Sequence, residues 1–113
     1  MITYWHNPRC SKSRAGLALL QERGAEVTLR LYLQDRPSLK DITALHKALG
    51  GAVIGMMRSG EKVFKDLGLS KTSPEADLLA AMVQEPILIE RPIAVKQDKA
   101  VIGRPTEALE ALL

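Results

Sequence analysis

The first 32 residues of this 113-residue chain constrain its fold most, because their pattern predicts a strand, a helix and a second strand. Residues 2–6 are predicted to form a short strand, and residues 13–23 place apolar or small side chains at helical spacing before Gly24. Residues 26–32 alternate as a half-buried strand does, with an apolar side expected to be buried (Val27, Leu29, Leu31) and a second side expected to be polar (Thr28, Arg30, Tyr32). Two such strands are expected to run parallel with a right-handed crossover, and a parallel sheet places its ligands beyond the carboxyl ends of its strands.

The loop between the first strand and the helix holds the only cysteine of the chain, Cys10. Because Asn7-Pro8 predicts a turn, the Cys10 sulfur is expected at the helix N-terminus, where unpaired N–H groups and the helix dipole favour an anion. Positive charge and hydroxyl donors near a thiol also lower its pKa. Such neighbours are Arg9, Lys12 and Arg14, which are charged, and Ser11 and Ser13, which carry hydroxyl groups. We therefore interpret Cys10 as a nucleophilic thiolate.

Two residues of this loop have a second interpretation. A lone cysteine is often only a small buried apolar side chain, although a structural cysteine does not need so many polar neighbours. His6, at the end of the first strand, can orient the loop or tune the thiolate, but a histidine there is about as often a hydrogen-bonded structural residue.

Length and composition fit a single domain over residues 1–113, with 46% apolar residues to build a core. The net charge of +3 comes from scattered basic residues, and 4% aromatic residues are poor material for base stacking, so no nucleic acid partner is predicted. Neither a metal nor a bound cofactor is predicted, because the sequence has no zinc-type Cys/His spacing, Walker loop or dinucleotide fingerprint. The single cysteine and the lack of a signal segment or long apolar run predict a cytoplasmic protein with no membrane association.

A helical insertion is predicted between the second and third strands, from about residue 38 to residue 85. Ser38 and Asp41 predict an N-cap and an acidic first turn, and Ser73 followed by Pro74 at the first helical position predicts another helix start. The predicted helices are residues 39–49, 52–57, 62–67 and 74–85. Arg58 lies at a junction between two of them, where a solvated arginine and a functional one are equally compatible with the local sequence.

The C-terminal part predicts an antiparallel hairpin followed by a last helix that extends to Leu112. The predicted strands are residues 93–95 and 100–103, joined by a turn at 97–99. Arg91-Pro92 precedes the first strand and Arg104-Pro105 follows the second, so the two arginines are expected at the same end of the hairpin. Two guanidinium groups there would form a fork for a tetrahedral oxyanion. The alternative is a salt bridge at the rim, for instance between Arg91 and Glu90, which would contribute little energy.

This order of elements resembles the thioredoxin fold, in which an X-Pro bond facing the active cysteine is cis; Pro92 is the matching proline. The resemblance implies an α/β fold with a thioredoxin-like sheet, made of a parallel βαβ unit and a C-terminal antiparallel hairpin. Three segments are more closely similar to the glutaredoxin-dependent arsenate reductase (ArsC-like) family. They are residues 6–14 (His-Asn-Pro-Arg-Cys-Ser-Lys-Ser-Arg), residues 86–93 (Pro-Ile-Leu-Ile-Glu-Arg-Pro-Ile) and residues 102–105 (Ile-Gly-Arg-Pro).

The resemblance implies an enzyme of arsenic detoxification, an oxidoreductase that reduces arsenate. Cys10 would attack arsenate, while Arg58, Arg91 and Arg104 would bind the oxyanion. From the charges and hydrogen-bonding groups of the loop itself, His6, Ser13 and Arg14 are expected to tune the thiolate. Glutathione is implied as a co-substrate and glutaredoxin as the partner that clears the resulting disulfide, with arsenite as the product.

Two alternatives remain at this stage. One is a regulator similar to Spx, which shares the fold and binds RNA polymerase without turnover. Spx typically begins with Cys-x-x-Cys, whereas Cys10 is followed by Ser13 in a Cys-x-x-Ser motif that cannot form an internal disulfide. The other is a thiol transferase without a preference for arsenate. Three arginines of the oxyanion-binding type favour the reductase over both.

Overall fold

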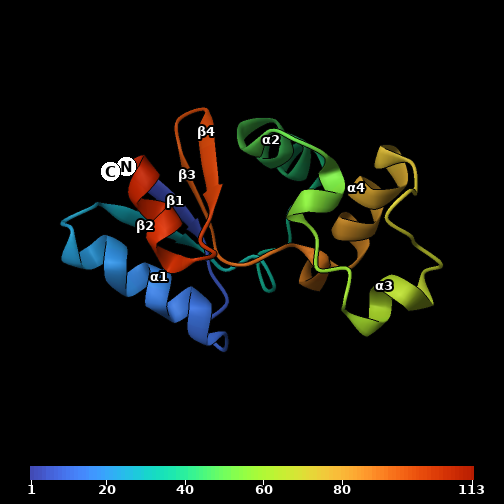
Figure 1. Cartoon of the computed structure of the whole chain (residues 1–113), viewed down its shortest axis with the longest axis horizontal. Helices are drawn as coiled ribbons and strands as arrows, with labels where there is room; N and C mark the ends of the chain where they lie inside the picture. Colours follow the sequence, from blue (N-terminus) through green and yellow to red (C-terminus); the bar gives the residue numbers. More distant parts are fainter. The chain divides into compact units, whose positions relative to one another are not determined.

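The computed structural model describes all 113 residues, which divide into two units (Figure 1). The first, here called the sheet unit, comprises Met1–Asp35 and Arg91–Leu113. The second, here called the helical unit, comprises Arg36–Glu90 and contains the whole predicted helical insertion of about residues 38–85. The grouping of all residues into one domain stays a prediction. No helix has both the length and the apolar character needed to cross a bilayer.

The sheet unit is built on four strands in the order β2-β1-β3-β4. The strands are β1 (Ile2–Trp5), β2 (Val27–Arg30), β3 (Ile93–Lys96) and β4 (Lys99–Ile102). β1 pairs in parallel with β2 and antiparallel with β3, and β3 pairs antiparallel with β4. This mixed sheet confirms the predicted parallel βαβ unit, the C-terminal hairpin and the thioredoxin-like α/β class. The hairpin turn is shorter than predicted, because Lys99 already pairs with Lys96 in the ladder.

The helix α1 (Ser11–Glu22) and the 3-10 helix η3 (Thr106–Leu112) pack against each other beside the sheet (Figure 1). Between them and the strands lies an apolar cluster of Ile2, Tyr4, Leu20, Ala94, Leu109 and Leu112. Every member of this cluster is buried, so it forms the core of the sheet unit. This packing holds the start of α1 against the carboxyl end of β1.

Two glycines allow α1, β4 and η3 to approach one another closely. A Cβ atom at Gly103 would lie 2.8 Å from Pro92 Cγ and 3.1 Å from Leu109 Cδ1. A Cβ atom at Gly16 would lie 2.8 Å from Leu109 Cδ1 and would also meet the Tyr4 hydroxyl. Such separations are too short for carbon atoms, so a larger residue at either position would force neighbouring side chains to shift.

One part of the predicted burial pattern is wrong. Leu29 was expected on the buried side of its strand, yet its side chain is 47% exposed. β2 is an edge strand of the sheet, where a side chain has a neighbouring strand on one side only. Tyr32, expected on the polar side, is fully buried, and its ring lies 5.9 Å from that of Trp5.

The helical unit contains five short helices. They are α2 (Leu39–Leu49), η1 (Val53–Met56), α3 (Lys62–Asp66), α4 (Glu75–Gln84) and η2 (Pro86–Leu88). α2 begins as predicted, with a capping box in which the Ser38 hydroxyl accepts from the Asp41 N–H and the Asp41 carboxylate accepts from the Ser38 N–H, both at 3.1 Å. α4 begins one residue later than predicted. Pro74 occupies its N-cap, and the Ser73 hydroxyl accepts from the Ser70 N–H instead.

Candidate active site

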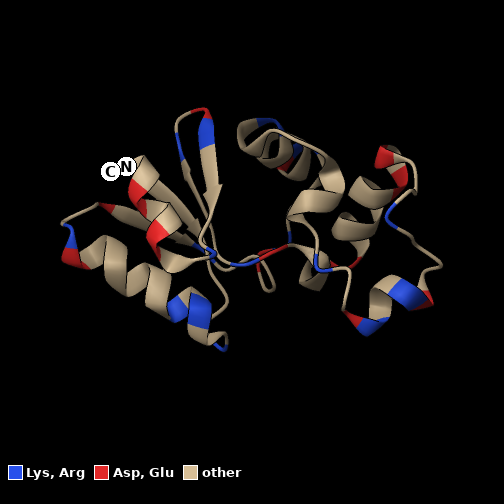
Figure 2. Ribbon diagram, viewed as in Figure 1, with Lys and Arg blue, Asp and Glu red and all other residues tan.

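Cys10 is the N-cap residue of α1, with extended backbone angles (φ −92°, ψ 122°). Its N–H donates to the Asn7 carbonyl at 3.0 Å, and its own carbonyl accepts from the Arg14 N–H at 3.0 Å, which is the first bond of the helix. α1 therefore begins two residues earlier than predicted, directly after the cysteine. The first turn contains no acidic residue, and Figure 2 shows basic residues at this end of α1. The sulfur is thus attached at the positive end of the helix dipole.

The hydroxyl of Ser13 organises the loop that carries Cys10. It lies 2.7 Å from His6 Nδ1 and accepts from the Asn7 N–H at 3.0 Å, and all three residues are buried. The Asn7 side chain in turn accepts from the Arg9 N–H at 3.0 Å, which closes a turn of the kind expected for Asn7-Pro8. The Ser13 hydroxyl was expected to donate to sulfur, but in the structure His6 and Asn7 occupy it.

Arg14 acts on His6 through its positive charge. The Arg14 guanidinium donates to the Pro8 carbonyl at 2.8 Å and so lies over the loop. Burial, and then the positive charge of Arg14, lower the pKa of His6 below its usual value. The lowered pKa favours the neutral, hydrogen-bonding form of the His6 imidazole.

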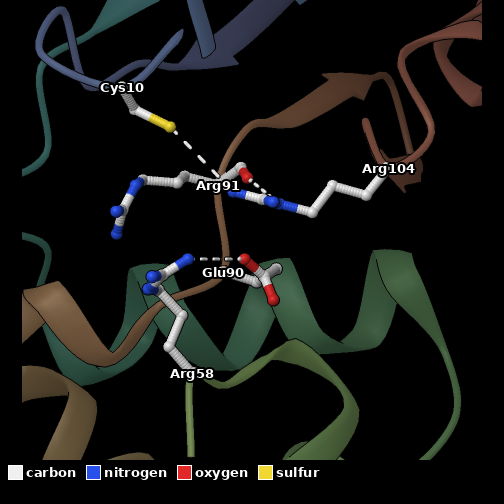
Figure 3. A network of polar contacts seen from close by, with 5 residues as sticks. All are labelled: Cys10, Arg58, Glu90, Arg91 and Arg104. Atoms are coloured by element: carbon white, nitrogen blue, oxygen red, sulfur yellow. Dashed lines mark hydrogen bonds and ion pairs between the residues drawn. The ribbon is translucent and has the colours of Figure 1, made fainter. Parts of the chain in front are cut away.

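The arginines of the two Arg-Pro pairs lie at the same end of the hairpin, because Ile93 pairs with Ile102 in the β3–β4 ladder. Arg104 donates from Nε to the Arg91 carbonyl at 2.7 Å, and its Nη2 atom lies 3.9 Å from the Cys10 sulfur, within reach of a weak hydrogen bond (Figure 3). The fold thus brings together Cys10, Arg91 and Arg104, which are far apart in the sequence.

Several groups compete to set the pKa of Cys10. Burial alone raises it, but the surrounding donors outweigh burial, so the pKa of the Cys10 thiol is lowered. The groups that lower the pKa are, in order of size, the backbone N–H of Ser13, the side chain of Arg91 and the backbone N–H of Lys12. Ser13 therefore acts on the thiol through its backbone and not through its hydroxyl.

Pro92 lies beside this cluster at the start of β3. The Arg91–Pro92 peptide bond is cis, and so is the Arg104–Pro105 bond. The Pro92 carbonyl accepts from the Gly103 N–H at 2.8 Å, which ties the two Arg-Pro segments together.

Arg58 belongs to the helical unit. Its backbone N–H donates to the Leu88 carbonyl at 2.7 Å, and its Nη1 atom lies 3.3 Å from Glu90 Oε1 (Figure 3). Both side chains are partly buried, and they line a hollow of about 360 Å³ together with Met57, Ser59, Gly60 and Glu61. No group of three or more metal-ligating side chains is found in the structure.

Tyr4 also supports the loop that carries Cys10, and the sequence patterns did not identify it. Its hydroxyl donates to the Ser13 carbonyl at 2.6 Å, and its ring lies 5.6 Å from that of His6. The signal was present, because Ile2, Tyr4 and His6 alternate along a strand and so lie on the same face of the sheet.

Together, a thioredoxin-like sheet and an N-capping cysteine beside two arginines define a class: thioredoxin-fold proteins with a single cysteine at a helix N-terminus. Within that class the chain belongs to the ArsC family, whose sequence model matches residues 5–112. It is 44% identical over 114 aligned residues to the arsenate reductase of Neisseria meningitidis, with 99% of this chain and 97% of the relative covered. It is 40% identical to the arsenate reductase of Haemophilus influenzae, with 99% of this chain and 98% of the relative covered. A solved structure, the arsenate reductase from Vibrio cholerae, superposes with a TM-score of 0.94 at 39% identity. The match covers 99% of this chain and 97% of that structure.

Proposed function

We propose that this protein is an arsenate reductase in which the Cys10 thiolate is the nucleophile. The observation that carries the proposal is the position of the Cys10 sulfur, at a helix N-terminus and 3.9 Å from Arg104 Nη2, with Arg91 lowering its pKa. A thiolate beside guanidinium groups suits attack on an oxyanion, because the cations stabilise the anion that would otherwise repel it. The names of the relatives support arsenate as that oxyanion.

In the first step, the Cys10 sulfur attacks arsenic(V), an As–S bond forms, and one arsenate oxygen leaves as water or hydroxide. Arg91 and Arg104 bind the remaining oxygens, since guanidinium groups can make paired hydrogen bonds to an oxyanion. Arg58 is proposed as the third cation of this set. His6, Ser13 and Arg14 keep the loop and the thiolate in position.

In the second step, the thiol of glutathione loses its proton and attacks the Cys10 sulfur. An S–S bond forms between glutathione and Cys10, and the As–S bond breaks with its electron pair left on arsenic. The two sulfur atoms give up two electrons, which reduce arsenic(V) to arsenic(III), and arsenite leaves. Cys10 is the only cysteine, so the chain has no resolving thiol of its own. We therefore propose that glutaredoxin removes the glutathione from Cys10 by thiol–disulfide exchange. The electrons come from thiols, no bound cofactor is needed, and a cytoplasmic location would keep Cys10 reduced.

The proposal is tested by following NADPH consumption with arsenate, glutathione, glutaredoxin and glutathione reductase. The wild-type protein should consume NADPH only when arsenate, glutathione and glutaredoxin are all present. The Cys10→Ser variant should not, because a serine hydroxyl is a far weaker nucleophile and cannot form the disulfide. Arsenate-dependent consumption no greater than that of Cys10→Ser would contradict the assignment.

Two other outcomes would point to the alternatives. Reduction of glutathione mixed disulfides without any reduction of arsenate would indicate a thiol transferase. Capture of RNA polymerase by the protein, with no turnover, would indicate a regulator of the Spx type.

A further inference from the structure

Tyr4 connects the core of the sheet unit to the first turn of the helix that carries the reactive cysteine. Its side chain is fully buried in the middle of β1, on the same face as His6. Its hydroxyl donates to the Ser13 carbonyl at 2.6 Å, a short and buried hydrogen bond. Ser13 is the third residue of α1, so this bond fixes the helix start to the central strand.

Ser13 is held from two sides. Its carbonyl accepts from Tyr4, and its hydroxyl contacts His6 Nδ1 and accepts from the Asn7 N–H. The peptide N–H of the same residue is the group that contributes most to lowering the pKa of Cys10. The position of this N–H relative to the sulfur therefore depends on how firmly Ser13 is held.

Gly16 gives the Tyr4 hydroxyl the space it needs. A Cβ atom at residue 16 would meet the hydroxyl oxygen of Tyr4. The next turn of α1 is thus kept without a side chain at the point where Tyr4 reaches Ser13. Burial raises the pKa of Tyr4 to about 12, so the hydroxyl stays protonated and remains a donor over the whole pH range in which a thiol titrates.

We propose that Tyr4 is a positioning residue for the Cys10 thiolate: its bond to the Ser13 carbonyl fixes the first turn of α1 to β1, and so fixes the helix N-terminus that Cys10 caps. It acts through Ser13 and does not touch the substrate. This role rests on the proposed function of Cys10 as a nucleophile, but not on which oxyanion is reduced.

The Tyr4→Phe variant tests this role, because it removes one oxygen and keeps the ring in the core. Other charged or titratable groups near Cys10 remain unchanged in the variant: Arg91, Arg104, His6, Lys12 and Arg14. The measurement is the rate of Cys10 alkylation by iodoacetamide as a function of pH. We expect the midpoint of this profile to rise by about half a pH unit in Tyr4→Phe, since part of the free energy of one hydrogen bond is lost from the thiolate.

Tyr32→Phe is the matched control. Tyr32 is also fully buried in the sheet unit, and its ring lies 5.9 Å from that of Trp5. Tyr32→Phe should leave the alkylation midpoint at the wild-type value, whatever it does to thermal stability. A merely structural role for Tyr4 would lower the melting temperature of Tyr4→Phe and leave its midpoint unchanged, and this result would overturn the proposal.

A second experiment keeps the proposal testable if Tyr4→Phe does not fold. Replacing both tyrosines by 3-fluorotyrosine makes the hydroxyl more acidic and a stronger donor, so the midpoint should fall below the wild-type value. No change, or a rise, would contradict the proposal. A wild-type midpoint at or above about 8.5, the value of a free thiol, would overturn the nucleophile assignment itself. A low wild-type midpoint that Tyr4→Phe does not alter would overturn only the role of Tyr4.

Discussion

Arg104 places its Nη2 atom 3.9 Å from the sulfur of Cys10, a residue 94 positions away in the sequence. The same guanidinium donates through Nε to the carbonyl of Arg91 at 2.7 Å. This double role requires a planar group with several donors in fixed directions, which lysine lacks. Arg104 is therefore expected to affect both the thiolate and the bound oxyanion.

The Arg104→Lys variant should bind sulfate or arsenate about tenfold more weakly than the wild type, although the charge is kept. This factor corresponds to roughly 1.5 kcal/mol, the lower end of the range for a hydrogen bond to a charged group. Titration calorimetry measures the affinity. Arg23→Lys, at the far end of α1 in a surface ion pair with Glu110, is the control and should bind normally. Equal affinities in both variants would mean that the planar geometry of Arg104 is not used.

Glu90 neutralises Arg58, with Oε1 and Nη1 3.3 Å apart. If Arg58 binds the oxyanion as proposed, this carboxylate opposes binding, because it competes with the oxyanion for the guanidinium. Glu90→Gln should raise oxyanion affinity by roughly two- to fivefold, the factor expected from a partly exposed ion pair. Glu61 lines the same hollow, and the control variant Glu61→Gln should have no such effect on oxyanion affinity. A loss of affinity in Glu90→Gln would show that Glu90 supports the site instead of competing with it.

Acid should destabilise the fold through His6. The pKa of His6 is lowered in the folded protein, so below about pH 6.5 the unfolded chain binds more protons than the folded one. The free energy of unfolding should therefore be highest above this pH and fall as the pH drops through the folded pKa. Urea unfolding from pH 7 to pH 5 measures the slope.

His6→Asn should reduce this loss of stability at low pH, because asparagine does not titrate. The same slope in wild type and His6→Asn would assign the acid sensitivity to other groups.

Gly16→Ala should destabilise the protein by about 1–3 kcal/mol, the usual cost of overpacking. The new Cβ atom would lie 2.8 Å from Leu109 Cδ1 and would meet the Tyr4 hydroxyl. Alanine is favoured over glycine in a helix by about 1 kcal/mol, but this gain is expected to be smaller than the cost. Gly60→Ala, with no atom within 4 Å, is the control, and urea unfolding compares the two. A Gly16→Ala variant as stable as Gly60→Ala would show that the core can adjust.

The elements of the site that depend on local sequence were predictable. The turn at Asn7, the cysteine at a helix start and the N-cap at Ser38 follow from backbone preferences of neighbouring residues. The meeting of Arg91 and Arg104 was also predictable, because a hairpin returns the chain to the same end of the sheet.

Features that depend on packing were not predictable in the same way. Leu29 is exposed because its strand lies at an edge of the sheet. The sequence of a strand does not predict its position in the strand order. The Ser13 hydroxyl lies between His6 and the Asn7 N–H, and sequence gives no means to choose these partners over sulfur. Arg58 and Glu90 form an ion pair between two segments of the chain. The periodicity of the sequence does not show that these segments lie side by side.

The pH dependence of Cys10 alkylation in the wild-type protein is the most direct test of Cys10 as an activated nucleophile in an oxyanion site. Cys10 is the only cysteine, so every alkylation event reports on it. Two backbone N–H groups and Arg91 lower its pKa, and we therefore predict a midpoint clearly below the value of about 8.5 for a free thiol. Arsenate should slow the reaction by occupying the arginines beside the sulfur. A midpoint at or above 8.5, with no protection by arsenate, would contradict the assignment of Cys10 as an activated nucleophile in an oxyanion site.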